Sequence, residues 1–146
     1  MPALFDVNVL VNAHRRDNRE YRFYHDWLRE FLDSDVEFFY SEFVLSGFVR
    51  VVTNPRIYNV PTALDVALQA TETIRSHRKG TRVSPGSRHW TIFRDLAVRT
   101  KASGNTMPDT YFAALAIESG AEWITSNQGF RVFEPDLRWR LLRPSN

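Results

Sequence analysis

Hydrophobic positions along this chain fall into two alternating patterns. Short apolar runs bounded by polar or turn-forming residues are typical of buried strands, whereas apolar residues three or four positions apart predict helices. The runs predict strands over residues 3–7, 37–40, 81–84, 122–125 and 139–142. The helical spacing predicts helices over residues 8–14, 19–33, 42–53, 61–77, 87–102 and 108–120. Strands that alternate with helices predict an α/β fold, with a central, mostly parallel sheet flanked by helices on both faces.

Several residues mark where these elements begin and end. Ser41 is a candidate N-cap for the helix that starts at Glu42, and Pro108 starts a helix with Asp109 in its first turn. Gly104 is the expected C-cap of the helix over 87–102. The last strand, 139–142, is expected at an edge of the sheet.

Length and composition predict one domain spanning residues 1–146. The chain contains no cysteine, which excludes disulfides, thiol catalysis and thiolate metal sites. No apolar run approaches the roughly 20 residues of a membrane span, and the first residues lack a basic leader. We therefore expect no membrane association and a cytoplasmic location.

The formal charge of +2 conceals a strong preference for arginine, because all but two of the 19 basic residues are arginines. Guanidinium groups pair with phosphates through two hydrogen bonds, which suits a nucleic-acid partner, although genome base composition also explains the bias. Three basic clusters could contact RNA phosphates or could be solvated helix faces. They are Arg15 with Arg16, Arg75 with Arg78 and Lys79, and Arg94 with Arg99 and Lys101.

Three acidic residues occupy equivalent positions in the predicted topology. Asp6 ends the first strand, Glu42 follows the second, and Asp109 begins the helix before the strand over 122–125. Because parallel strands place their carboxyl ends at one edge of a sheet, these side chains could meet there. Gathered carboxylates repel unless a cation compensates, and ligands that are all oxygen suit Mg²⁺ or Mn²⁺.

Each acid also has a purely structural interpretation. Asp6 could be only the N-cap of the following helix, while Glu42 and Asp109 could interact favourably with a helix dipole, worth about 0.3–1 kcal/mol. The occurrence of three acids at matching positions, each beside an apolar strand or helix, favours a shared site.

Four segments, taken in order, resemble the PIN-domain toxins of VapBC toxin–antitoxin systems. They are Phe5-Asp6-Val7-Asn8-Val9-Leu10, Ser41-Glu42-Phe43-Val44, Pro108-Asp109-Thr110-Tyr111-Phe112-Ala113-Ala114-Leu115-Ala116 and Thr125-Ser126-Asn127. The resemblance implies a PIN fold and Mg²⁺- or Mn²⁺-dependent endoribonuclease activity on structured RNA. It also implies a homodimer that is neutralised by a small VapB-like antitoxin.

The same resemblance assigns roles to individual residues. Asp6, Glu42 and Asp109 match the acidic catalytic residues, with Asp6 and Asp109 as the metal ligands. Asn127 stands where a fourth catalytic acid is usual, and because an amide supplies no charge, a second metal would be held more weakly. Asn8 matches the polar residue that supports the first acid. Thr125 and Ser126 could hydrogen-bond the metal ligands or the scissile phosphate.

The expected reaction is phosphodiester hydrolysis by a metal-activated water, which would leave a 5′-phosphate and a 3′-hydroxyl. Glu42 or Asp109 would orient or deprotonate that water. The substitution at Asn127 leaves open a catalytically impaired PIN-like RNA-binding module. A haloacid-dehalogenase-type phosphatase is a further alternative because Phe5-Asp6-Val7-Asn8 resembles its nucleophile motif, but that motif has an acid where Asn8 stands.

Overall fold

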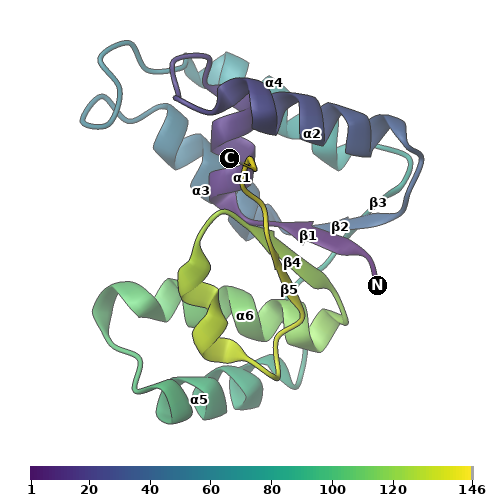
Figure 1. Cartoon of the computed structure of the whole chain (residues 1–146), viewed down its shortest axis with the longest axis vertical. Coiled ribbons are helices and arrows are strands. Elements are labelled where there is room, and N and C mark those ends of the chain that lie inside the picture. Colours follow the sequence, from purple (N-terminus) through teal and green to yellow (C-terminus); the bar gives the residue numbers. More distant parts are fainter. Residues whose placement is uncertain (146) are drawn as a thin grey trace.

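A five-stranded sheet lies at the centre of the computed structural model, which describes residues 1–145 (Figure 1). The strands are β1 (Ala3–Phe5), β2 (Phe38–Tyr40), β3 (Gly80–Arg82), β4 (Glu122–Thr125) and β5 (Trp139–Leu141). Their order is β3-β2-β1-β4-β5, and all four neighbouring pairs are parallel. The predicted parallel sheet is confirmed, as is the position of the last strand at an edge.

The six predicted helices are all present, with bounds shifted by a few residues. They are α1 (Val7–His14), α2 (Tyr21–Asp33), α3 (Glu42–Val52), α4 (Leu64–Arg75), α5 (His89–Thr100) and α6 (Met107–Ser119). In Figure 1, α1 to α4 lie on one side of the sheet and α5 and α6 on the other. No helix within residues 1–145 combines the length and apolar character needed to cross a lipid bilayer.

Two short 3₁₀ helices were not predicted, η1 (Gly104–Thr106) and η2 (Gln128–Phe133). The first explains why the prediction for Gly104 is wrong. Helix α5 ends at Thr100, and Lys101 adopts the left-handed conformation of a C-cap with φ of 55°. Gly104, with φ of 50°, instead opens η1. The expected N-cap at Ser41 is confirmed, since its hydroxyl accepts a hydrogen bond from the Val44 amide at 3.3 Å.

The core has two layers because both faces of the sheet are covered. On one face, the Trp123 ring of β4 stacks on Phe112 of α6 with 5.4 Å between centroids. On the other, Phe5 of β1 packs edge-on against Phe31 of α2 at 5.2 Å. Burial on both sides explains why β1 and β2 read as continuous apolar runs, whereas the edge strands β3 and β5 are more polar and more exposed. Leu4, in register with Trp123, is completely buried.

We predict that Leu4→Ala lowers the free energy of unfolding by about 2–5 kcal/mol, because it leaves a cavity in the middle of β1. Urea unfolding followed by circular dichroism measures the loss. Val36→Ala is the matched control, since Val36 is 51% exposed and its truncation should change stability by no more than about 0.5 kcal/mol. Equal effects of the two substitutions would contradict the described core.

Candidate active site

A surface depression of about 330 Å³ lies at the carboxyl ends of β1 and β4. It is lined by Asp6, Val7, Asn8, Val11, Asn12, Arg50, Val51, Pro108, Asp109, Phe112 and Asn127. Four of the residues singled out from sequence therefore meet there, namely Asp6, Asn8, Asp109 and Asn127. The parallel topology brings them together because β1 and β4 are neighbours and end at the same edge.

Asp6 is both a helix cap and a member of this depression. It follows β1 directly, its amide donates to the carbonyl of Ile124 at 2.9 Å, and its carboxylate Oδ1 accepts from the Val7 amide at 2.6 Å. Its other oxygen, Oδ2, accepts from Thr125 Oγ1 at 2.6 Å and from Asn8 Nδ2 at 3.0 Å. The two interpretations drawn from sequence are thus compatible, and the cap orients the carboxylate.

Asn8, Thr125 and Ser126 tie the start of α1 to the end of β4. Thr125 is fully buried, and its Oγ1 accepts from the Asn127 amide at 3.0 Å while donating to Asp6. Asn8 Oδ1 accepts from the Ser126 amide at 3.0 Å. The Thr125 and Asn8 side chains hold the Asp6 carboxylate in a single orientation, and the Ser126 backbone amide fixes Asn8.

Asp109 reaches the same depression from the first turn of α6. It is half-buried, and among residues 1–145 no hydrogen bond or ion pair ends on its carboxylate. The two acids therefore differ in their surroundings. Asp6 accepts three hydrogen bonds from the protein, which leaves room for one further contact, whereas the Asp109 carboxylate accepts none within residues 1–145.

Burial of these acids raises their pKa values. Desolvation is the main cause for Asp6, whose pKa rises from 3.8 to about 6 despite the opposing hydrogen bonds from Thr125 and Val7. The nearby charge of Asp109 raises it further. The pKa of Asp109 is itself raised by burial. Because two neighbouring buried carboxylates are costly to ionise, a bound cation would stabilise the charged forms of both.

Asn127 contributes an amide to the rim of the depression. Its side-chain Oδ1 accepts a hydrogen bond from the Gly129 amide at 2.9 Å and caps η2. An amide oxygen has a second lone pair, so this contact leaves it able to accept one further donor or to face a cation. Asn127 adds no charge to the two acids.

Glu42 is not among the residues that line this depression, although it was predicted to share a site with Asp6 and Asp109. Its carboxylate pairs with Arg75 of α4 at 3.0 Å and with Arg82 of β3 at 3.4 Å. The reason is helical rotation, because Gly47, Arg50 and Val51 share the face of α3 that borders α1 and the depression. Position 42 lies on a different side of the same helix.

Four of the eight residues in the three basic clusters, Arg15, Arg75, Arg78 and Arg99, pair with carboxylates of the protein. Arg15 pairs with Asp17, Arg99 with Asp136, and Arg78 with Asp35. The basic residue in the depression is Arg50, which was not singled out from sequence. Arg50 lies one turn after Gly47 in a largely apolar helix. An isolated charge one turn after a glycine is the signal that could have indicated it.

The donor set suits one hard divalent cation. The carboxylates of Asp6 and Asp109 and the amides of Asn8, Asn12 and Asn127 line the depression, with no histidine among the lining residues. Mg²⁺ takes one or two carboxylates and completes its shell with water or phosphate oxygens, and Mn²⁺ accepts similar ligands. Within residues 1–145 no three His, Cys, Asp or Glu side chains form a metal-binding group. The residues therefore fit one metal ion and lack the charge for a tightly held second one.

Comparisons with known proteins agree with this geometry. The model of the PIN domain family matches residues 3–134. Ribonuclease VapC43 of Mycobacterium tuberculosis strain H37Rv is 42% identical over 92% of this chain and 91% of its own length. Ribonuclease VapC25 of the same strain is 32% identical over 89% of this chain and 92% of its own length.

Solved structures share the fold at low sequence identity. VapBC2 from Rickettsia felis, bound to a DNA fragment from its promoter, has a TM-score of 0.68 at 17% identity and covers 96% of this chain and 98% of its own. VapBC-1 from nontypeable Haemophilus influenzae has a TM-score of 0.65 at 16% identity, with coverage of 96% and 97%. The chain thus shares its arrangement of strands and helices with these structures.

We predict that Asp109→Asn stabilises the metal-free protein at about pH 8 and has no effect near pH 4. A carboxyl whose pKa is raised on folding contributes stability below its ordinary pKa of 3.8, and loses it as the pH rises through the folded value. The substitution removes that loss and the repulsion on Asp6. Solvent screening at this half-buried position limits the gain to about 1–2 °C in Tm. Thermal melts in EDTA at both pH values measure it, and an equal shift at both would contradict the electrostatic origin.

Proposed function

The chain belongs to the PIN domain family, among its VapC-type members, and we propose that it is the toxin of a type II toxin–antitoxin pair, a Mg²⁺- or Mn²⁺-dependent endoribonuclease. The observation that carries this proposal is the convergence of Asp6 and Asp109 in one depression, both with raised pKa values. The VapC ribonucleases, at up to 42% identity over most of the chain, support the substrate class.

In this proposal Asp6 is the fixed ligand of the metal. Its carboxylate is held by Thr125, Asn8 and the Val7 amide, so it needs little rearrangement to bind a cation. Pre-ordered ligands reduce the entropy lost on binding. Asn8, Thr125 and Ser126 therefore act by positioning Asp6.

Asp109 would be the second ligand and would orient the attacking water. Its carboxylate has free lone pairs within the depression, so it can accept a hydrogen bond from a water while facing the metal. The bound metal ion would supply Lewis-acid activation of that water and neutralise charge on the phosphate. In-line attack would leave a 5′-phosphate and a 3′-hydroxyl.

The partners follow from the same family membership. We propose an RNA substrate, a VapB-like antitoxin encoded with the toxin, and a homodimer. The solved relatives are described as VapBC assemblies, which supports the antitoxin. An enzyme that cuts cellular RNA, in a chain with no cysteine, is also consistent with a cytoplasmic location.

A second candidate is a catalytically impaired RNA-binding module, which is favoured by the amide at Asn127 and by the position of Glu42 outside the depression. The phosphatase alternative is less compatible with the structure. Its supporting lysine has no counterpart here, since neither Lys79 nor Lys101 lines the depression.

We predict that the purified protein cleaves total RNA with Mn²⁺ and not with EDTA. Asp6→Asn and Asp109→Asn should lower the rate by at least about 100-fold, as expected for loss of a group that acts in the transition state. Glu42→Gln is the matched control and should retain nearly full activity, because its carboxylate pairs with Arg75 on the surface. Gel analysis with end-group mapping measures both rate and product ends.

Three outcomes would count against this assignment. Cleavage that continues in EDTA and leaves cyclic phosphates would exclude the carboxylate mechanism. Loss of activity in Glu42→Gln with retention in Asp109→Asn would reverse the roles of these acids. Tight RNA binding without any cleavage would favour the impaired module.

We predict that Asn127→Asp strengthens metal binding. The new carboxylate keeps the acceptor for the Gly129 amide and adds one charge beside Asp6 and Asp109. The Mn²⁺ concentration giving half of the thermal shift should fall on the order of tenfold, or about 1.4 kcal/mol. Gln69→Glu, an exposed change on α4, adds the same charge elsewhere and should leave the midpoint unchanged. Equal shifts in both variants would mean that net charge alone is responsible.

A further inference from the structure

Arg50 lines the depression that holds Asp6 and Asp109, yet it does not neutralise them. Its side chain is exposed, and among residues 1–145 no ion pair or hydrogen bond ends on its guanidinium. Several other arginines pair with carboxylates instead, as Arg15 does with Asp17 and Arg75 with Glu42. Arg50 is thus a free fork of hydrogen-bond donors beside the proposed metal site.

A glycine explains how Arg50 comes to lie there. Gly47 is one turn earlier on α3, and a Cβ at this position would come within 3.0 Å of Val7 Cγ2 on α1. Because Gly47 has no side chain, α3 approaches the start of α1 closely. Arg50 and Val51, three and four residues further on, then share one wall of the depression with α1.

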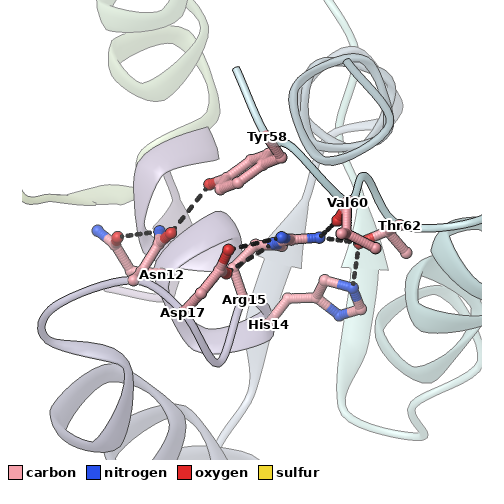
Figure 2. A network of polar contacts seen from close by, with 8 residues as sticks. Asn12, His14, Arg15, Asp17, Tyr58, Val60 and Thr62 are labelled. Carbon is pink, nitrogen blue, oxygen red and sulfur yellow. Dashed lines mark hydrogen bonds and ion pairs between the residues drawn. The ribbon is translucent and has the colours of Figure 1, made fainter. Parts of the chain in front are cut away.

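Asn12 stands on that wall, one turn after Asn8 on α1. Figure 2 shows it at one end of a polar network at the end of α1. Its Oδ1 accepts from Asn18 Nδ2 at 2.9 Å, and Asn18 in turn accepts from the Tyr58 hydroxyl at 3.1 Å. The Asn12 amide nitrogen has no partner within residues 1–145, so it remains a donor for the depression.

The rest of the network holds this end of the wall in place. The Arg15 guanidinium lies 3.9 Å from the centre of the Tyr58 ring and forms a two-pronged pair with Asp17 at 2.9 and 2.7 Å. It also donates to the carbonyl of Val60 at 2.9 Å and to Thr62 Oγ1 at 3.1 Å, as Figure 2 shows. Arg15, for which the sequence left open an RNA contact or a solvated helix face, fixes the loop between α3 and α4 against α1.

We propose that Arg50 and Asn12 bind a phosphate of the RNA backbone next to the metal site. The guanidinium offers charge and two parallel donors to phosphate oxygens, and the Asn12 amide offers a third donor from the neighbouring helix. Asp6 and Asp109 attract a cation on the same surface, so the depression presents donors for the RNA backbone beside ligands for the metal. This inference rests on the proposed endoribonuclease function and names the residues that hold its substrate.

The test compares RNA binding by variants that cannot cut. In an Asp109→Asn background, affinity for a structured RNA is measured over a range of salt concentrations. Arg50→Ala should reduce the slope of log K against log salt by about one, because one phosphate contact is lost. Arg50→Lys should keep the slope. Asn12→Ala should weaken binding with the slope unchanged, since the amide is neutral.

Arg22→Ala is the matched control, because Arg22 is exposed on α2 and lies outside the depression. In the cutting-competent protein, Arg50→Ala should lower cleavage by about 10-fold or more with an unchanged Tm, whereas Arg22→Ala should cut normally. Identical slopes and cleavage for Arg50→Ala and Arg22→Ala would overturn the proposal while leaving the ribonuclease intact. Absence of cleavage by the unsubstituted protein would contradict the proposed function, and the salt slopes would still decide the role of Arg50.

Discussion

The hydrogen bond from Thr125 to Asp6 connects the two halves of this molecule at the point where its chemistry is proposed. The donor and acceptor are 2.6 Å apart, yet 119 positions separate them in the chain. The contact exists because β1 and β4 are parallel neighbours that end together, which places the last residue of one beside the residue following the other. Burial makes the Asp6 charge costly, and Thr125, Asn8 and the Val7 amide offset part of that cost. A cation shared with Asp109 would offset the rest, so the same burial that raises the pKa of Asp6 favours a metal ligand.

Helix α3 shows how rotation about one axis decides which residues reach the site. Glu42 and Arg50 both lie on this helix, and composition alone would favour the acid as the member of a carboxylate cluster. The close approach permitted by Gly47 turns Arg50 and Val51 toward α1, while Glu42 meets Arg75 and Arg82. The depression consequently contains two acids and one free guanidinium. That balance fits a polyanionic substrate better than a cluster of three acids would, because the phosphate backbone meets fewer like charges.

Much of the fold could be read from the chain before the structure. All five strands and six α-helices were predicted, as were the parallel sheet and the Ser41 cap, because apolar spacing and cap chemistry are local properties. The resemblance to PIN-domain toxins is confirmed by the family match over residues 3–134. The prediction failed at the end of α5, where a residue with no intrinsic preference for positive φ takes the C-cap. Gly104 was a reasonable helix end, yet Lys101 takes the left-handed position and α5 stops earlier. The 3₁₀ helices were missed because such short turns carry little periodic signal.

For the site, the sequence by itself identified Asp6, Asn8, Asp109 and Asn127, since a polar residue at the end of an apolar strand or the start of a helix stands out locally. It also indicated the α/β class and the order of elements. Only the tertiary structure decided which side chains meet. Which side chains of a helix face the site depends on what the helix packs against. The absence of Glu42 from the depression and the presence of Arg50 and Asn12 therefore follow from contacts between α1, α3 and the α3–α4 loop. The raised pKa of Asp6 likewise depends on burial by segments far apart in the chain, and no local pattern encodes that environment.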